Sequence, residues 1–298
     1  PLLKRVMMNK NQKKCFILIP TFNDWDSLEI LLKKIEDNIK DEQRVYEILI
    51  IDDASTIDHD LKISEIKKIK KIDIIRLKKN SGSQIAIATG LNFINKEKES
   101  GAILILDSDG EDDPNSLETF LSHLDEDATK VVVAERKKRK ENIFLRILNI
   151  IRLYFTFAFT GKMMDFGNFS CLNNKHLEQI FNKKELNLSY SGTIQKFLPI
   201  KKIPIEKQVR YSGKSKVSII FLILYSIQIL SIFSANFFIR TTMFLTFFIV
   251  FQYFSDLNLY IELAVILYLI SNLLILKTFF SVRNNDFLQL IEKINKVK

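Results

Sequence analysis

The stretch Ile103–Pro114 constrains the fold more than any other part of this 298-residue chain. Four apolar residues in a row, Ile103 to Leu106, predict a strand buried on both faces, which is typical of a parallel sheet. Five carboxylates follow within seven residues, and Pro114 then favours the first turn of a helix. The stretch therefore predicts a buried strand that ends in a crowded acidic loop.

The acidic loop has two interpretations. Carboxylates crowded at a strand end repel one another, and a divalent cation removes that cost because hard cations prefer carboxylate oxygen. A turn after Leu106 would bring Asp107 and Asp109 onto one ion, which in turn can hold a diphosphate. The alternative is a loop that only caps the next helix, since D-x-D triplets are common by chance. The preceding strand and the motifs below favour the functional interpretation.

Strand and helix patterns alternate through the first half of the chain. Apolar runs predict strands at 15–20, 46–51, 72–77, 102–106 and 131–134, and helical spacing predicts helices between them. These include a basic amphipathic helix marked by Ile63, Ile66 and Ile69, and helices over 83–95 and 114–124. This alternation predicts an α/β fold with a mostly parallel sheet and helices on both faces. Ligands bind beyond the carboxyl ends of such strands. Three predicted ends carry polar groups, at 21–24, 52–53 and 107–113.

The alternation weakens after residue 140. Here the patterns predict an apolar helix over 143–159, an extended segment over 165–172 and helices near 174–182 and 190–198. The run from Arg210 to Lys216 is basic, hydroxyl-rich and hinged at Gly213. Its charges and loop amides suit a phosphate. It also fits the positive flank of a membrane segment, and the two interpretations are compatible.

Three apolar runs follow, at 217–239, 241–255 and 257–276, with basic residues before the first and after the last. Both flanks are therefore expected in the cytoplasm, which requires an even number of crossings. The polar residues within 217–235 favour that run as the one lying in the interface. The expected organisation is a cytoplasmic catalytic domain at 1–213, a juxtamembrane interfacial helix at 214–236, a transmembrane hairpin at 237–281 and a cytoplasmic basic tail at 282–298.

Composition narrows the partners and the compartment. The net charge is +9, but no aromatic interleaving or nucleic-acid motif accompanies the lysines, so anionic lipid headgroups are favoured over nucleic acid. Cys15 and Cys171 lie in strand-like runs and are expected as core residues in a reducing compartment. The three histidines, His59, His123 and His176, are expected at the surface. The N-terminal stretch lacks the apolar core of a signal peptide.

Taken in order, the motifs resemble the family 2 glycosyltransferases, in particular the polyprenyl-phosphate group that includes dolichol-phosphate mannose synthase-like and bactoprenol glucosyltransferase-like enzymes. The resemblance covers nearly the whole chain. Asp24 replaces the usual Glu of the first-strand motif. The segments that carry the resemblance are 19–24, 51–55, 80–90, 106–114 and the R-x-x-G-x-S-K run at 210–216.

The resemblance implies a Rossmann-like nucleotide-diphospho-sugar transferase (GT-A) fold and inverting sugar transfer from a nucleotide-diphospho-sugar to a polyprenyl phosphate, with Mg2+ or Mn2+. It implies that the nucleotide sugar is bound by Pro20, Thr21, Asp24, Asp52, Asp53, Ser108 and Asp109. It implies a metal site of Asp107, Asp109 and Glu111, and an acceptor-phosphate site of Arg136, Arg210, Ser215 and Lys216. The residues it implies for catalysis are Asp109, Asp112, Asp165 and Arg210.

One segment departs from the family pattern, because Asn168 and Ser170 stand where the family often has Asp and Arg. An amide cannot accept a proton as a carboxylate does. Either Asp165 or Asp112 substitutes for the base, or no base is needed, or activity is reduced. Replacement of Arg210 is expected to weaken use of the acceptor and to leave donor binding nearly unchanged, because the donor should sit near Asp52 and Asp107.

Two other functions stay open at this stage. One is a glycosyltransferase of the same fold that acts on another glycan or lipid acceptor. The other is a catalytically weak membrane scaffold that binds a nucleotide sugar. The expected location is the inner (cytoplasmic) membrane, as a multi-pass protein with both termini cytoplasmic. The sequence leaves open the sugar, the base and the oligomeric state, a homo-oligomer included.

Overall fold

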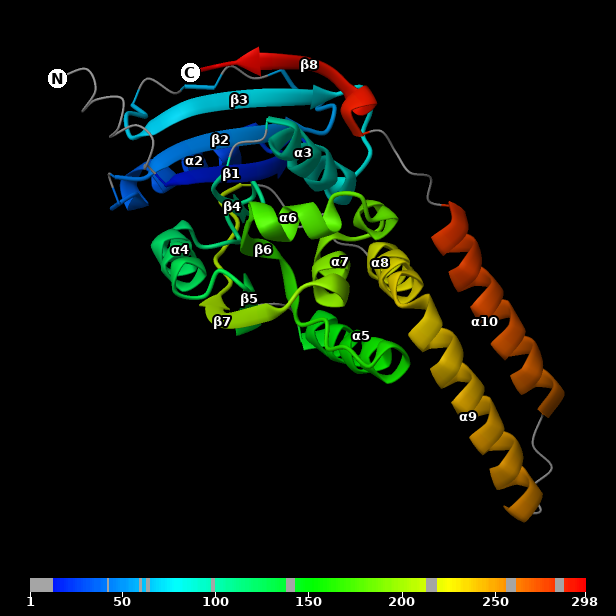
Figure 1. The fold of residues 1–298 in the computed structure, drawn as a ribbon. Coiled ribbons are helices and arrows are strands. Elements are labelled where there is room, and N and C mark those ends of the chain that lie inside the picture. The colour runs from blue at the N-terminus through cyan, green and yellow to red at the C-terminus, as the bar shows by residue number, and fades with distance from the viewer. Residues whose placement is uncertain are drawn as a thin grey trace. The chain divides into compact units, whose positions relative to one another are not determined.

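A computed structural model describes residues 13–41, 43–58, 61–62, 65–97, 100–137, 143–212, 219–255, 261–281 and 287–298 (Figure 1). The chain divides into two compact units. The first consists of Pro1–Lys140, Phe166–Ser215 and Asn285–Lys298, and the second of Glu141–Asp165 and Lys216–Asn284.

Within the described residues, the first unit holds an eight-stranded sheet in the order β7-β5-β6-β4-β1-β2-β3-β8. Strands β3, β2, β1 and β4 run parallel, as do β5 and β7, whereas β6 is antiparallel to both its neighbours and β8 is antiparallel to β3. The predicted α/β fold with a mostly parallel sheet is confirmed. The strands are β1 Lys14–Thr21, β2 Val45–Asp52, β3 Ile69–Leu77, β4 Ala102–Ile105, β5 Val131–Lys137, β6 Phe166–Asn173, β7 Ile200–Glu206 and β8 Ile291–Lys296.

Helices cover both faces of this sheet. Apolar side chains of α2 (Trp25–Asn38) and α4 (Leu117–Glu126) pack in the core on one face. Those of α3 (Ser83–Glu97), α6 (Asn174–Ile180) and α7 (Tyr190–Phe197) pack in the core on the other. Short 3-10 turns lie at η1 Pro114–Ser116, η2 Lys184–Asn187 and η3 Phe287–Leu290.

The prediction of a helix from the spacing of Ile63, Ile66 and Ile69 is wrong. Ile69 begins β3 instead, and the described residues 65–68 just before it are not helical. The spacing of three arises because the pairing of β3 with β2 is irregular, so that Tyr46 faces Ile69 while the next residue of β2 faces Lys71. An irregularity of this kind places Ile69 and Ile72 in the same core cluster, which imitates a helical period.

The cysteines and one histidine test the burial predictions. Cys15 and Cys171 are free and fully buried, as expected. His176 is also buried, contrary to the expectation of a surface position. Its backbone N–H donates to the Asn173 side chain at 3.1 Å, and its ring Nδ1 accepts from the Asn173 backbone at 3.4 Å. This reciprocal cap of α6 requires the ring to turn inward, and burial lowers the pKa of His176.

The second unit consists of helices α5 Ile143–Thr160, α8 Ile219–Ile232, α9 Ser234–Ser255 and α10 Ile261–Ser281. In the described part of the chain, two helices are long and apolar enough to cross a membrane, over Ser234–Phe254 and Ile261–Ser281. Two side chains of α9 satisfy carbonyls at the end of α5, with Asn236 donating to Thr160 O at 3.0 Å and Arg240 to Ala158 O at 3.1 Å. The outward side of α5 exposes Ile147, Ile150, Ile151, Tyr154, Phe155 and Phe157.

The last strand was not predicted. Residues 282–298 were expected as a basic tail, but Ile291–Lys296 pairs with β3 from Leu77 to Asp73 and forms β8 (Figure 1, red arrow). Phe287, just before it, is buried in the core between α3 and the sheet. The end of the chain is therefore part of the first unit.

Candidate active site

Two parallel strand ends meet at one edge of the sheet, as the sequence predicts. Thr21 at the end of β1 faces Asp52 at the end of β2, and the Asp53 N–H donates to the Thr21 carbonyl at 2.9 Å. On the other side of β1, Leu106 follows β4 and its N–H donates to Leu18 O at 3.3 Å. This register brings the polar ends of β1, β2 and β4 together in the first unit.

Asp52 is buried and held by two groups. Its Oδ2 accepts from Arg76 Nη1 at 2.7 Å, and its Oδ1 accepts from the Ser55 N–H at 2.8 Å. Arg76 also donates to Ser55 O at 2.8 Å and to Glu292 of β8 at 3.2 Å. Arg76 thus ties together the ends of β2 and β3, the loop after β2, and β8.

Asp53 fixes the loop before α3. Its two carboxylate oxygens accept the N–H groups of Ser81 and Gly82, both at 2.7 Å. Gly82 adopts a φ of +89°, in the left-handed region that glycine reaches without strain. Burial raises the pKa of Asp53, and these two amides oppose that effect. Asp53 therefore links β2 to the start of α3.

The acidic loop after β4 folds around its own backbone. The Asp107 N–H donates to Asp112 Oδ2 at 3.0 Å, and the Glu111 N–H donates to Asp109 Oδ1 at 2.9 Å. Asp113 caps η1 by accepting the Asn115 N–H at 3.0 Å. Asp112 is almost fully buried by this arrangement, so in this structure its carboxylate shapes the loop.

The surroundings of Asp109 raise the pKa of its carboxyl group. Burial, followed by the negative charge of Asp107, raises its pKa from an ordinary 3.8 to about 6, although the Glu111 amide and the Arg210 guanidinium oppose the change. A negative charge at this position is therefore costly in the folded chain even with Arg210 nearby.

Segment 207–211 lies against this acidic loop. Arg210 Nη1 donates to Asp109 Oδ2 at 2.8 Å, and Nη2 lies 3.5 Å from Asp24 Oδ2. Lys207 pairs with Glu111 at 2.7 Å, and the Tyr211 N–H donates to Asp109 O at 3.1 Å. Arg210 thus contacts two residues expected in the donor site, because the chain folds back across the end of β4.

Gly110 allows this close approach. Its φ is +83°, and a Cβ at that position would lie 2.3 Å from the Tyr211 ring. The Lys34 ammonium lies 4.3 Å from the centre of the same ring, which adds a cation–π contact. The glycine and the tyrosine together fix segment 207–211 over the acidic loop.

Asn168 also reaches the loop. Its Nδ2 donates to Asp107 Oδ1 at 3.1 Å, so the residue that departs from the family pattern touches a predicted metal ligand. Sequence reasoning missed three further residues with contacts here: Gln84, Arg76 and Lys207. Strand register could have flagged Arg76, which pairs with Asp52, and Gln84 lies within the family segment 80–90, but no local pattern marks Lys207.

The predicted metal set is only partly assembled. Among the described residues, no group of three or more His, Cys, Asp or Glu side chains is arranged to hold a metal ion. Glu111 is paired with Lys207 and Asp109 with Arg210, while Asp107 and Asp109 interact electrostatically as a carboxylate pair. The charge of Asp107 contributes to the raised pKa of Asp109. Such a pair fits Mg2+ or Mn2+, which commonly bind one or two carboxylates together with substrate phosphates.

Other predicted residues have different outcomes. Pro20, Thr21 and Ser108 are buried, and the Thr21 hydroxyl has no hydrogen-bond partner among the described residues. Ser215 and Lys216 lie outside the described residues, as does the side chain of Arg136. Asp165 belongs to the second unit, and its role as a base stays a prediction.

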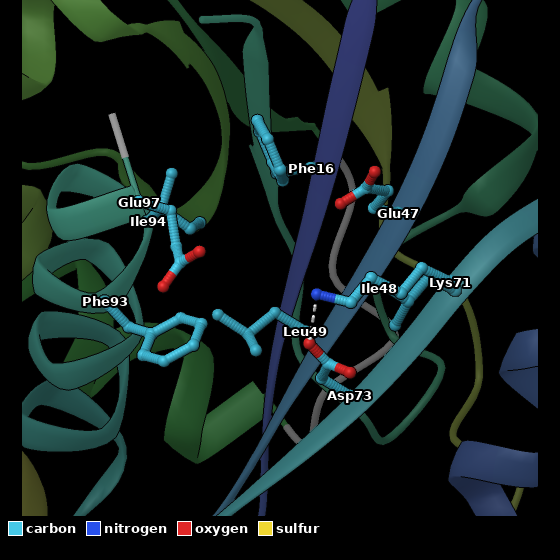
Figure 2. A pocket seen from close by; sticks show the side chains of 9 residues that line it. All are labelled: Phe16, Glu47, Ile48, Leu49, Lys71, Asp73, Phe93, Ile94 and Glu97. Atoms are coloured by element: carbon cyan, nitrogen blue, oxygen red, sulfur yellow. Dashed lines mark ion pairs between the residues drawn. The ribbon is translucent and has the colours of Figure 1, made fainter. Parts of the chain in front are cut away.

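A small cavity lies elsewhere on the sheet (Figure 2). It is lined by Phe16, Glu47, Ile48, Leu49, Lys71, Asp73, Phe93, Ile94 and Glu97, which come from the first halves of β1, β2 and β3 and from the end of α3. Lys71 and Asp73 form an ion pair of 2.6 Å at its wall. Its volume of about 30 Å³ is that of a single water molecule. The cavity is too small for a sugar nucleotide and lies toward the amino ends of the strands.

A mostly parallel sheet with an acidic loop at its carboxyl edge defines a glycosyltransferase of the GT-A type. The chain belongs to the family described as Glycosyl transferase family 2, whose model matches residues 16–182. The family predicted from the motifs is thereby confirmed.

The chain resembles curated enzymes named undecaprenyl-phosphate 4-deoxy-4-formamido-L-arabinose transferase from two strains of Klebsiella pneumoniae. Each is 28% identical over 222 residues, which cover 71% of this chain and 64% of the relative. The chain thus spans less than two thirds of the length of the curated undecaprenyl-phosphate transferases that it matches.

Solved structures share the fold at low identity. Glucosyl-3-phosphoglycerate synthase from Mycobacterium tuberculosis, in complex with Mn2+, UDP-glucose and phosphoglyceric acid, aligns with a TM-score of 0.52 and 12% identity, over 77% of this chain and 81% of that one. Residues 1–349 of TarS from S. aureus align with a TM-score of 0.50 and 14% identity, over 90% and 83%.

Proposed function

We propose that this chain is a membrane-anchored, metal-dependent, inverting glycosyltransferase that moves a sugar from a nucleotide-diphospho-sugar to a polyprenyl phosphate. The observation that carries the proposal is the contact between Arg210 and Asp109, which brings a phosphate-binding cation to the acidic pair at the carboxyl edge of the sheet. The similarity to undecaprenyl-phosphate transferases supports the acceptor class.

The donor is proposed to lie along the ends of β1, β2 and β4. Asp107 and Asp109 would hold Mg2+ or Mn2+, which masks the negative charge of the donor diphosphate. The buried Thr21 hydroxyl supports a role in the donor site, because it has no partner among the described residues. The other residues proposed for the donor are Pro20, Asp24, Asp52, Asp53 and Ser108.

The acceptor phosphate is proposed to bind Arg210, together with Arg136, Ser215 and Lys216. An Arg fork makes two charge-assisted hydrogen bonds to phosphate oxygens. In the described structure Arg210 pairs with Asp109 and contacts Asp24, which keeps a cation at the point where two anionic substrates must meet. This arrangement lowers the repulsion between the donor diphosphate and the acceptor phosphate.

The reaction is a single displacement. An oxygen of the acceptor phosphate forms a bond to the anomeric carbon while the bond from that carbon to the nucleoside diphosphate breaks, so the configuration inverts. A phosphate is already anionic at neutral pH, and it needs orientation and charge masking more than a base. The placement of Asp112 inside the loop and of an amide at Asn168 is compatible with a reaction that needs no dedicated base.

The membrane part is proposed to comprise the interfacial helix near 214–236 and the hairpin near 237–281, with the catalytic domain and both termini in the cytoplasm. Strands β7 and β8 flank this part of the chain and belong to the same sheet. A sheet cannot be divided by a bilayer, so the chain between them must cross an even number of times. The exposed apolar side of α5 suits the membrane surface as well.

A direct assay tests the proposal. Purified chain in detergent or in membranes is mixed with undecaprenyl phosphate and a panel of nucleotide sugars, and the lipid product is followed by mass spectrometry. We expect a glycosyl monophospholipid that requires Mg2+ or Mn2+ and disappears with EDTA. Transfer to glycan acceptors but not to the lipid phosphate would contradict the acceptor assignment.

A further inference from the structure

A continuous series of three hydrogen bonds leads from the Tyr190 backbone in the core to the Asp107 carboxylate. The Tyr190 backbone N–H donates to Gln84 Oε1 at 2.7 Å, and Gln84 Nε2 donates to Asn168 Oδ1 at 3.2 Å. Asn168 Nδ2 then donates to Asp107 Oδ1 at 3.1 Å. This series of hydrogen bonds joins α7, α3 and β6 to the acidic loop, all within the first unit.

The Tyr190 backbone N–H sets the donor and acceptor roles in this series of hydrogen bonds. A backbone N–H can only donate, so Gln84 must turn its carbonyl oxygen toward Tyr190 and its NH2 group toward Asn168. Asn168 must then accept with its own oxygen and present its NH2 group to Asp107. The orientation of both amides therefore follows from one unambiguous donor rather than from a choice between nitrogen and oxygen.

Tyr190, where the series begins, is held in place by burial and by a second hydrogen bond. Tyr190 is fully buried, and its hydroxyl forms a 2.7 Å hydrogen bond with Ser170 Oγ. Ser170 Oγ in turn donates to the Asn168 backbone carbonyl at 2.9 Å. Tyr190 thus contacts the same short stretch of β6 through its hydroxyl and through Gln84, which closes a ring of polar contacts around Asn168.

We propose that Gln84 and Asn168 are positioning residues that hold the Asp107 carboxylate in the orientation that binds the metal. The proposal rests on the function proposed above, because it assigns these residues to that metal site. An amide suits the position because it donates to Asp107 without adding another negative charge beside the acidic loop. Asn168 is then a functional replacement of the family's acidic residue rather than a lost base.

The experiment reverses the donor and acceptor roles of the Asn168 side chain in this series of hydrogen bonds. In Gln84→Glu, the new carboxylate still accepts the Tyr190 N–H but has no hydrogen to give to Asn168. The Asn168 amide must then turn its NH2 group toward that carboxylate and its oxygen toward Asp107, which repels the Asp107 side chain. Mn2+ alone is titrated into full-length protein, and free Mn2+ is measured by electron paramagnetic resonance.

We expect Gln84→Glu to weaken Mn2+ binding by about 10–100-fold, the usual effect of losing a group that orients a metal ligand. Simple electrostatics predicts the opposite, because a new negative charge near the site attracts the cation. Gln179→Glu, on the exposed side of α6, adds the same charge as a matched control and should bind Mn2+ like the wild type. Thermal unfolding checks that each variant is folded.

The double variant decides whether the effect passes through Asn168. Asn168→Ala alone should weaken Mn2+ binding to a similar degree, and Gln84→Glu added to it should cause no further loss. If Gln84→Glu binds as the wild type does, or weakens binding equally without Asn168, the positioning role is overturned while the metal site stands. If the wild-type chain binds no Mn2+ at all, the metal assignment fails and the positioning role with it.

Discussion

Asp109→Asn should abolish sugar transfer and at the same time stabilise the metal-free protein. The pKa of Asp109 is about 6 in the folded chain against an ordinary 3.8, a difference worth about 3 kcal/mol at 1.36 kcal/mol per pKa unit. Asn keeps an acceptor for the Glu111 N–H but loses the ion pair with Arg210. We therefore expect the variant to be more stable by about 1–3 kcal/mol at pH 7.

The pH dependence follows from the direction of the change. The folded Asp109 carboxyl holds its proton more tightly than the unfolded one, so its cost to folding is absent below about pH 4 and grows as the pH rises toward 6. Above pH 7 the cost is constant. The advantage of Asp109→Asn should therefore shrink by roughly half between pH 7 and pH 5.

Urea unfolding of both proteins in EDTA, followed by circular dichroism at pH 7 and pH 5, measures the difference. Saturating Mn2+ should stabilise the wild type but not the variant, because the ion removes the charge cost only where the carboxylate is present. A variant that is less stable than the wild type at pH 7 would refute the argument about charge cost. Near-normal sugar transfer by the variant would refute the metal assignment.

Three further predictions concern neighbouring features. Arg210→Ala should weaken use of the lipid phosphate by about 1.5–3 kcal/mol, seen as a higher KM or a lower kcat at saturating donor, whereas an unchanged acceptor dependence would remove Arg210 from that site. Gly110→Ala should destabilise the protein by about 1–3 kcal/mol in urea unfolding, because its φ of +83° and the Tyr211 ring both exclude a side chain. A single cysteine placed at residue 298 should react with a membrane-impermeant maleimide only from the cytoplasmic side, and labelling from outside alone would contradict an even number of crossings.

The sheet was predictable from the sequence because its central strands are buried on both faces. Continuous apolar runs such as Ile103–Leu106 have few alternatives to a parallel strand between two helical layers. The family motifs then located the carboxyl edge. Polar groups at the ends of both strands placed Thr21 and Asp52 at this edge, and the family motifs assigned both residues to the donor site.

The missed elements depend on long-range contacts that no local pattern encodes. Strand β8 is short and rich in lysine, and it becomes a strand only because the edge of β3 is open to pair with it. Arg210 reaches Asp109 from a distant part of the chain, through a docking that Gly110 permits. Asn168 looked like a lost base because its partners, Gln84 and Asp107, lie on other elements.

The internal contacts of the acidic residues distinguish Asp52 and Asp53, which stabilise the fold around the site, from Asp109, which is proposed to bind the metal. Asp52 and Asp53 have partners for their charge, in Arg76 and in the amides of Ser55, Ser81 and Gly82. Burial nevertheless raises the pKa of Asp53, so its charge keeps part of its cost in the folded chain. The effect is larger at Asp109, whose pKa is raised to about 6 even with Arg210 beside it. A charge that the fold leaves costly is one that a bound cation can relieve, so the acidic pair after β4, rather than the pair after β2, is where binding energy from a metal and a diphosphate has most to act on.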